Sequence, residues 1–193
     1  MASTTPIVER LRAIVRPVRH ATPPPPHGGL PASVLLLCDP STAGVPLLFV
    51  LRSADLRSHP GQIAFPGGSA EPADSDVVET ALREANEELG IEPENVEVLG
   101  LLSPFATVVS DRWLTPVVAL ERTPSTLRGD GFEVAEWFRV DIADLMVAPH
   151  TVRELQRDGV ARQVHFYDVP DRVIWGVTGV IVHELLALLG RTD

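Results

Sequence analysis

Most apolar residues of this chain fall into runs of strand length, separated by short stretches rich in glycine, proline and aspartate. Residues 33–38 (SVLLLC) and 45–52 (VPLLFVLR) are almost continuously apolar, which is typical of strands buried on both faces. The segment between them, DPSTAG, carries residues that favour turns. Further segments with strand-like patterns are residues 61–65, 95–102, 113–120, 131–140 and 161–169.

One helix is predicted with both a start and a stop signal. In residues 75–89, apolar positions recur at helical spacing and form one stripe. Asp76 can cap the first turn, with Glu79 three residues later, and Gly90 can end the helix in the left-handed conformation. The stripe consists of Val78, Leu82, Ala85 and Leu89.

The N-terminal part of the chain predicts an accessory helix rather than a second domain. The same stretch is rich in arginine, as organelle transit peptides are, but a helical apolar stripe favours docking on the body. Four prolines at positions 23–26 predict a stiff linker. We therefore expect residues 1–26 to form a helix and linker and residues 27–193 to form one domain. The stripe consists of Ile7, Leu11, Ile14, Val15 and Val18.

The remaining segments complete a mixed α/β pattern. Residues 141–146 predict a short helical turn, and residues 173–189 predict a closing helix. Residues 149–163 are long and polar for a connection, which is typical of a substrate lid or of a loop with one helical turn. Many strands interleaved with few helices indicate a mixed α/β fold, and 193 residues can bury a sizeable core.

Composition narrows the classes of function. The formal charge of -10 argues against nucleic-acid binding through a basic surface, and all 16 basic residues are arginine. Cys38 is the single cysteine, which excludes an intrachain disulfide, and its apolar surroundings predict an inert core thiol. No apolar run approaches the roughly 18 residues that cross a membrane, and the sequence predicts no secretory h-region. We expect a cytoplasmic protein that binds neither membranes nor nucleic acids.

The strongest chemical signal is a group of three glutamates on the predicted helix. Glu84 and Glu88 are four residues apart and Glu84 and Glu87 three apart, so a helix projects all three from one face. A solvated acidic face is the simplest interpretation. However, like charges at these spacings repel, only Arg83 is near enough to offset them, and an apolar loop with two glycines precedes the helix. Oxygen ligands in this arrangement suit Mg²⁺ or Mn²⁺.

These residues resemble a known motif. Residues 83–91, REANEELGI, match the Arg-Glu-U-x-Glu-Glu-x-Gly-U core of the Nudix box, where U is aliphatic, and Gly68 matches the glycine that opens the box. This chain has 14 residues between Gly68 and Arg83, one more than the usual box. The acidic residue expected between them therefore falls to Glu71 or Asp74.

A second stretch resembles a narrower group. Residues 52–71, RSADLRSHPGQIAFPGGSAE, resemble a signature upstream of the Nudix box in coenzyme A pyrophosphatases, which share the longer spacing. Val50 stands where that signature often has threonine, and residues 173–186 resemble the C-terminal helix of the subfamily. The matching positions are Arg52, Ser53, Arg57, Gly61, Phe65, Pro66, Gly67, Gly68 and Glu71.

The resemblance implies a Nudix fold, with mixed β-sheets sandwiched between helices, and a metal-dependent hydrolase. The implied substrate is coenzyme A or a derivative, which is cleaved at its pyrophosphate to 3′,5′-ADP and 4′-phosphopantetheine or its acyl form. The implied ligands of Mg²⁺ or Mn²⁺ are Glu84, Glu87, Glu88 and Gly68. The implied catalytic residues are Glu84 or Glu88 as base and Arg83 as the partner of a ligand carboxylate. The implied substrate-binding residues are Arg52, Arg57, Gly67 and Gly68.

Several alternatives stay open. Strand alternation puts Glu133 and Glu136 on opposite faces, and either is a candidate for a further acid at the metal site. A Nudix hydrolase of another substrate such as ADP-ribose is the main alternative, and the upstream arginines favour coenzyme A. A non-catalytic nucleotide-binding module is disfavoured because all box glutamates are present. The preference among free, oxidised and acyl coenzyme A, the number of metal ions and the formation of a homodimer are undetermined.

Overall fold

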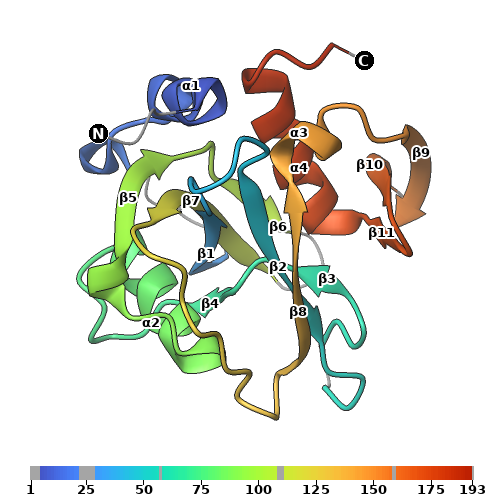
Figure 1. Ribbon diagram of the computed structural model, residues 1–193. Coiled ribbons are helices and arrows are strands. Elements are labelled where there is room, and N and C mark those ends of the chain that lie inside the picture. The colour runs from blue at the N-terminus through green and yellow to red at the C-terminus, as the bar shows by residue number, and fades with distance from the viewer. Residues whose placement is uncertain (1–4, 22–28, 57, 108–110, 158–159, 193) are drawn as a thin grey trace.

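The computed structural model describes residues 5–21, 29–56, 58–107, 111–157 and 160–192. Within these residues the strands form one sheet of eight strands and one of three, with helices packed around them (Figure 1). The expected mixed α/β fold is therefore confirmed. Arg57 and the four prolines at 23–26 lie outside the described residues.

The larger sheet contains both parallel and antiparallel pairs. Its strands are β1 (Leu30–Cys38), β2 (Pro46–Arg52), β3 (Ile63–Ala64), β4 (Gly67–Ser69), β5 (Val96–Leu101), β6 (Phe105–Thr107), β7 (Arg112–Glu121) and β8 (Val134–Asp141). β1 runs parallel to β7, whereas β5 and β6 pair with β7 in the antiparallel sense. At one end β1 pairs with β2, and at the other it pairs with the short strand β4. β2 in turn pairs with β3 and β8.

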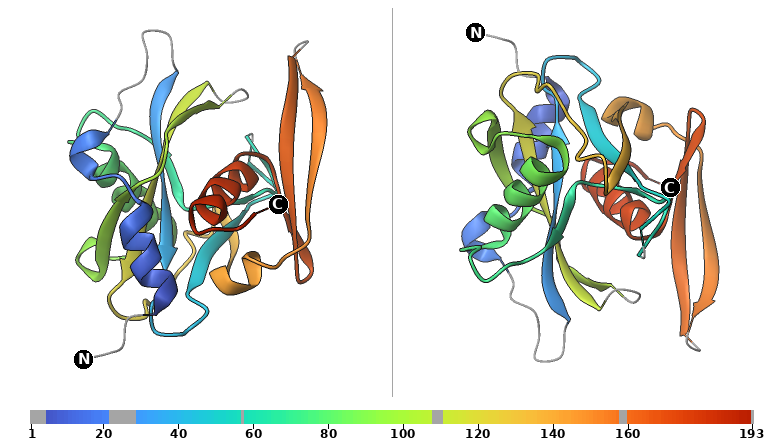
Figure 2. Two further views of the ribbon diagram at one scale, coloured as in Figure 1. Left: turned by 90° about the horizontal axis from the view of Figure 1, so that it is seen from above. Right: turned by 90° about the horizontal axis from the view of Figure 1, so that it is seen from below.

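Helices cover the central strands from two sides. The described α-helices are α1 (Pro6–Ile14), α2 (Val77–Leu89), α3 (Ile142–Leu145) and α4 (Gly176–Leu188), with 3₁₀ turns η1 (Val18–His20) and η2 (Pro93–Asn95). Figure 2 shows α2 and α4 on opposite sides of β1 and β7. None of these helices is long and apolar enough to cross a membrane.

Strand β1 contributes to two hydrophobic clusters through alternate side chains. Leu35 and Leu37 belong to the cluster that contains the buried residues of α2, whereas Leu36 and Cys38 belong to the cluster that contains those of α4. Because both faces of the strand are covered, both sets of positions must be apolar. This explains the continuous apolar run in the sequence.

The N-terminal helix docks on the body, as its apolar stripe predicted. Val8 and Leu11 of α1 are buried in the same cluster as α4. Thr5 caps the helix by accepting a hydrogen bond from the N–H of Val8 at 3.4 Å. Beyond the helix, Arg16 and Leu101 exchange backbone hydrogen bonds of 2.9 Å in each direction, which ties the segment to β5.

The described residues of the polar segment 149–163 are almost all in strands, so the interpretation as a loop with one helical turn is wrong. The segment forms β9 (His150–Arg157) and the start of β10 (Val160–Val169), and β11 (Arg172–Ile174) completes the smaller sheet. Residues 151–156 are exposed, so no buried face requires alternate apolar positions in β9. The closing helix predicted from residue 173 begins only at Gly176, because the preceding residues pair with β10.

Candidate functional site

Helix α2 begins and ends where its sequence signals predicted. The Asp76 carboxylate accepts hydrogen bonds from the N–H groups of Val78 and Glu79, at 2.8 and 2.9 Å. The Glu79 carboxylate accepts one from the N–H of Ser75 at 2.6 Å. Gly90 has a φ of 68°, the left-handed conformation that commonly ends a helix. These local contacts fix the two ends of α2, and therefore which residues the helix contains.

The three glutamates of α2 differ sharply in burial. Glu88 is only 4% exposed, Glu84 is half-buried, and the Glu87 side chain is 57% exposed. The structure thus departs from the single acidic face expected, because Glu88 is buried whereas Glu87 is exposed. Val78 and Leu82 of the predicted stripe are half-buried against the core. The buried residues of α2 are Thr80, Ala81, Ala85, Glu88 and Leu89.

Two glycines of β4 allow the carboxylates to approach the backbone. The N–H of Gly67 donates a hydrogen bond of 3.1 Å to Glu88 Oε2. Gly67 has a φ of 150°, and a Cβ there would overlap the carbonyl oxygen of Ser33. A Cβ on Gly68 would overlap the carboxylate of Glu84. The glycine pair is therefore required by close packing on β1 and on α2.

Burial makes negative charge costly at this point. It raises the pKa of Glu88 to about 8, although the Gly67 N–H and the guanidinium of Arg52 favour the ionised form. The pKa of Glu84 is also raised by burial, with Arg83 acting in the opposite direction. Two neighbouring carboxylates whose ionised forms are disfavoured make a favourable place for a cation.

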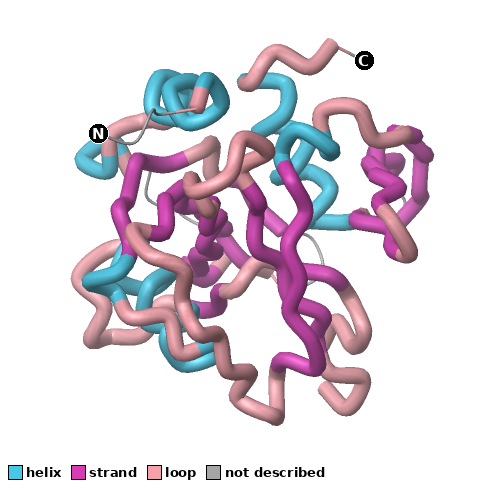
Figure 3. The backbone as a smooth tube through the Cα atoms, viewed as in Figure 1, coloured by secondary structure: helices cyan, strands magenta, loops and turns pink. Residues whose placement is uncertain are grey.

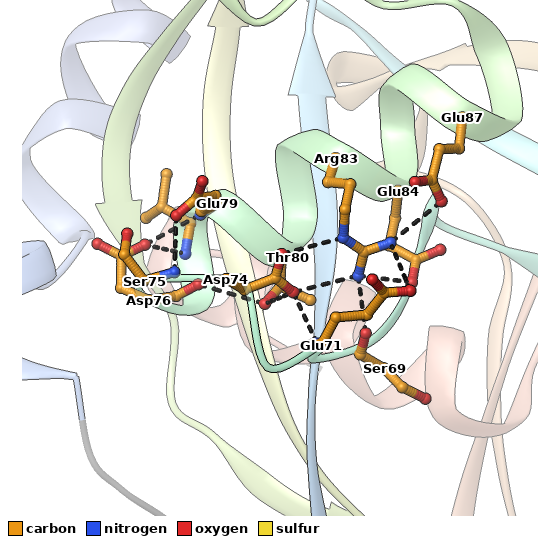
Figure 4. Close-up of polar contacts among 11 residues, drawn as sticks. Ser69, Glu71, Asp74, Ser75, Asp76, Glu79, Thr80, Arg83, Glu84 and Glu87 are labelled. Atoms are coloured by element: carbon orange, nitrogen blue, oxygen red, sulfur yellow. Dashed lines mark hydrogen bonds and ion pairs between the residues drawn. The ribbon is translucent and has the colours of Figure 1, made fainter.

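Arg83 is the centre of the polar network on α2 (Figure 4). Its Nε and Nη2 donate to the two carboxylate oxygens of Asp74, at 3.0 and 3.1 Å. Nη2 also donates to the Ser69 carbonyl at 2.9 Å and to Glu84 Oε1 at 3.1 Å. Nη1 donates to Glu87 Oε2 at 3.0 Å. A single guanidinium thus fixes β4, the loop before the helix and two of the three glutamates.

Between the two acids that the sequence left open, Asp74 is the main partner of Arg83. Its bidentate contact lowers the pKa of Asp74 to about 2, so this carboxylate stays ionised. Glu71 Oε1 is 3.8 Å from Arg83 Nη1, and its side chain is 60% exposed. Asp74 therefore neutralises and orients the arginine, while Glu71 lies at the edge of the network.

Arg52 links β2 to the buried glutamate. Its Nη1 is 4.0 Å from Glu88 Oε1, and its Nη2 is 3.5 Å from Glu133 Oε2. The pairing of β2 with β8 is irregular between Leu51 and Arg52, which changes the direction of the strand at this residue. Arg52 thus lies between an acid of α2 and the acid just before β8. Arg57 was predicted beside it but lies outside the described residues.

The β7–β8 loop determines which of Glu133 and Glu136 approaches the site. Figure 3 shows this loop passing the end of α2, where the N–H of Asp130 donates to the Glu88 carbonyl at 3.0 Å. The Asp130 carboxylate in turn accepts hydrogen bonds from the N–H groups of residues 132–134 at 3.0 to 3.1 Å. Glu133 is thereby held near Arg52, whereas Glu136 pairs with Arg172. The sequence did not single out Asp130, although its position before a glycine is typical of such turns.

A cavity of about 270 Å³ lies beside β4, between β1, β3 and α4. Gly67 and Gly68 form part of its wall, so the same backbone contacts both the glutamates and the cavity. Thr178 of α4 donates a hydrogen bond of 2.8 Å to the Ile63 carbonyl and joins the helix to β3 at the cavity edge. The polar residues that line the cavity include Arg52, His59, Gln62, Thr107, Arg112 and Thr178.

Sequence comparisons match this chain to a known family and to curated relatives. Residues 29–163 match the NUDIX domain family. NudL of Photorhabdus laumondii, described as an uncharacterized Nudix hydrolase, is 40% identical over 171 residues that cover 84% of this chain and 89% of the relative. NudL of Pectobacterium atrosepticum is 39% identical over 164 residues, which cover 83% of each protein.

Solved structures support the same fold. RenU, a Nudix hydrolase from M. smegmatis, superposes with a TM-score of 0.51 at 24% identity, covering 61% of this chain and 74% of that one. A NUDIX hydrolase from Alicyclobacillus acidocaldarius gives a TM-score of 0.51 at 19% identity, covering 64% and 83%. At these identities the likeness concerns the arrangement of strands and helices.

Proposed function

This chain belongs to the Nudix hydrolase family, and we propose that it hydrolyses the pyrophosphate bond of coenzyme A or one of its derivatives. The products are 3′,5′-ADP and 4′-phosphopantetheine or its acyl form. The position of Arg52, the first residue of the upstream signature, carries the proposal. Its guanidinium is 4.0 Å from Glu88 and its side chain lines the cavity beside β4. One arginine thus connects the acidic helix with a space that can receive a ligand.

The acidic residues fit a hard divalent cation, Mg²⁺ or Mn²⁺. Glu84 and Glu88 offer carboxylate oxygens beside the backbone of β4, and the missing side chain of Gly68 leaves the room that Glu84 occupies. We assign Glu84 and Glu88 as the main ligands, with Gly68 as a backbone ligand and the exposed Glu87 at the rim. When bound, the cation would screen the phosphates and lower the pKa of a coordinated water.

The remaining chemistry falls to the protein's own side chains. Glu84 or Glu88 orients the attacking water and takes its proton on a carboxylate oxygen. Arg83 acts through Glu84 and Glu87, because its contacts with Asp74 and Ser69 hold it in one orientation. It is therefore a positioning residue, and its loss should misplace two carboxylates together.

Arg52 is suited to exchange its present partner for a phosphate. Its contact with Glu133 is long, at 3.5 Å, and the Glu133 side chain is 45% exposed, so the pair is weak. Its buried Nε has no hydrogen-bond partner within the described part of the chain. A phosphate would satisfy such donors in the bidentate manner that arginine favours. Arg112 lines the same cavity, and Arg57 is a further candidate from the sequence.

Steady-state kinetics with Mg²⁺ and identification of the products test this proposal. We expect a higher kcat/KM for coenzyme A than for ADP-ribose, with 3′,5′-ADP among the products. Arg52→Ala should lower kcat/KM for coenzyme A about tenfold to a hundredfold, because a charge-assisted contact contributes about 1.5–3 kcal/mol. Arg122→Ala, which removes an exposed arginine just after β7, is the matched control.

Dephospho-coenzyme A shows which phosphate Arg52 binds. If the contact is to the 3′-phosphate, turnover of dephospho-coenzyme A should fall much less in Arg52→Ala; a contact to the pyrophosphate should affect both substrates alike. Unchanged kcat/KM for both substrates would show that Arg52 does not bind a phosphate group and has a structural role. Preferred cleavage of ADP-ribose would overturn the proposed substrate, and nucleotide binding without any cleavage would identify a non-catalytic module.

A further inference from the structure

Three histidines meet between the β9–β10 hairpin and α4, away from the glutamates of α2. We propose that His150, His165 and His183 together bind one transition-metal ion of the Zn²⁺ class, which fastens the hairpin to the helix. One ligand nitrogen of each ring lies within 4.8 Å of the other two. Among the described residues, these histidines form a group of three side chains of metal-binding type whose ligand atoms lie close enough together to hold one ion.

The register of the hairpin explains why two of the histidines share a face. His150 lies directly opposite Tyr167 in the antiparallel pair, and His165 precedes Tyr167 by two residues on the same strand. Side chains at these positions project from the same side of a sheet. The face that carries them is the one that packs on α4, since Tyr167 is buried in the same cluster as Ile181.

A glycine lets the helix approach this face closely. A Cβ on Gly179 would lie 2.5 Å from the carbonyl oxygen of His165, so any side chain there would push α4 away from β10. His183 follows Gly179 by four residues, which is about one helical turn. The close approach therefore brings the His183 ring onto the strand histidines, with its centroid 3.9 Å from that of His165.

Two of the three rings are already near the spacing of metal ligands. His150 Nε2 lies 3.0 Å from His165 Nδ1, a hydrogen bond in which the N–H of one ring donates to the nitrogen of the other. Two nitrogens bound to a tetrahedral zinc ion at about 2.0–2.1 Å would be separated by roughly 3.3–3.4 Å. The three rings are stacked on one another, with interplanar angles of 3° to 21°, and an imidazole nitrogen binds a metal ion in the plane of its ring. Binding therefore requires the rings to turn about their side-chain bonds until their nitrogens face one ion, which then replaces the shared proton.

The donor set selects the kind of ion. Imidazole nitrogens suit Zn²⁺, Cu²⁺, Ni²⁺ and Co²⁺, whereas Mg²⁺ and Mn²⁺ prefer oxygen ligands. The converging group contains no carboxylate, which distinguishes it from the glutamates of α2. The buried Tyr167 hydroxyl lies 3.0 Å from His183 Nδ1 and can orient that ring, as outer partners of metal-binding histidines commonly do.

The expected effect of the ion is to fix α4 in place. This helix supplies Val177, Thr178 and Ile181 to the wall of the cavity beside β4. Metal–nitrogen bonds to the histidines of β9, β10 and α4 would hold the helix on the side that faces away from the cavity. The ion would thus stabilise the fold and define the shape of the cavity without contacting a ligand inside it.

Metal titration of chelator-treated full-length protein tests the site, with excess Mg²⁺ present to occupy oxygen ligands. We expect one Zn²⁺ or Co²⁺ per chain with micromolar or tighter affinity, and the visible absorption of Co²⁺ bound by imidazoles in a low-symmetry site. His165→Gln and His183→Gln should each weaken binding at least about tenfold. His20→Gln, which alters an exposed histidine of η1, should leave binding unchanged.

X-ray absorption of the zinc-loaded wild-type protein gives a test that does not depend on the folding of any variant. The expected signal is a first shell at about 2.0–2.1 Å with the outer scattering of imidazole rings. Failure of the wild-type protein to bind a stoichiometric ion would overturn the proposal. So would a shell made of oxygen alone, or affinity that is unchanged in well-folded His165→Gln and His183→Gln.

Discussion

The glutamates of α2 and the histidines around α4 are two groups of side chains that we propose to bind metal ions, and they are built in opposite ways. The glutamates occupy adjacent turns of one helix, and differences in burial separate their roles. The histidines come from three elements and have similar, intermediate burial. The first group offers oxygen and carries negative charge, whereas the second offers nitrogen and is uncharged when its rings are neutral.

The difference is that helix geometry alone brings the glutamates together, whereas the tertiary fold brings the histidines together. A helix guarantees that residues three and four apart are neighbours, so the glutamates are close whatever surrounds them. Nothing in the chain guarantees that residues 150, 165 and 183 meet, and their proximity depends on strand register and on Gly179. The two groups should accordingly respond differently to substitution, to pH and to the identity of the ion.

The largest effect should come from Glu88. Glu88→Gln should lower kcat about a hundredfold or more, because it removes the buried charge that either binds the cation or receives the proton. Glu87→Gln should cost less than Glu88→Gln, since Glu87 is at the exposed rim. Kinetics at saturating Mg²⁺, with circular dichroism as a folding control, measure both. Near-normal turnover by Glu88→Gln would contradict a role of Glu88 in the reaction.

The next largest effect should come from Arg83. Arg83→Lys keeps a positive charge but loses the bidentate contact with Asp74, and we expect activity to fall about tenfold to a hundredfold. Asp74→Asn should cause a comparable loss if the pair acts as a unit, and the double variant should be little worse than either single one. Simple additivity of the two losses in kcat/KM would contradict a shared role.

A smaller effect, which concerns the oxygen ligands alone, is the pH dependence of the stabilisation of the protein by Mg²⁺. Because the pKa of Glu88 rises from 4.5 to about 8 on folding, the metal-free protein gains stability from this group at low pH and loses it as pH rises through 8. Mg²⁺ competes with that proton. The increase in Tm with Mg²⁺ should therefore be larger at about pH 8.5 than at about pH 6, and Glu88→Gln should reduce the difference.

The smallest effect should come from Cys38, which belongs to neither group. Burial raises the pKa of its thiol to about 12, so it stays protonated and unreactive. Cys38→Ala should keep full activity and lower the free energy of unfolding by about 1 kcal/mol. Denaturant unfolding and kinetics check this expectation. Loss of turnover in a folded Cys38→Ala protein would indicate a thiol-dependent step outside both groups.

The sequence predicted those parts of the protein whose structure depends on interactions between residues close together in the chain. The caps of α2, the doubly buried strand β1 and the docking stripe of α1 each depend on local periodicity and on a few terminal residues. The exposed strand β9 escaped prediction because no buried face constrained its pattern. The motif at residues 83–91 led to the correct fold and to the network around Arg83.

The sequence by itself determined that three glutamates lie on one helix and that two glycines precede them. Only the tertiary structure decided that Glu88 is buried and Glu87 exposed, because burial depends on where β4 and the β7–β8 loop pack. The choice of Asp74 over Glu71 and of Glu133 over Glu136 follows from contacts with arginines on other elements. The histidine cluster is the extreme case, since residues distant in sequence become neighbours only through strand pairing and helix packing.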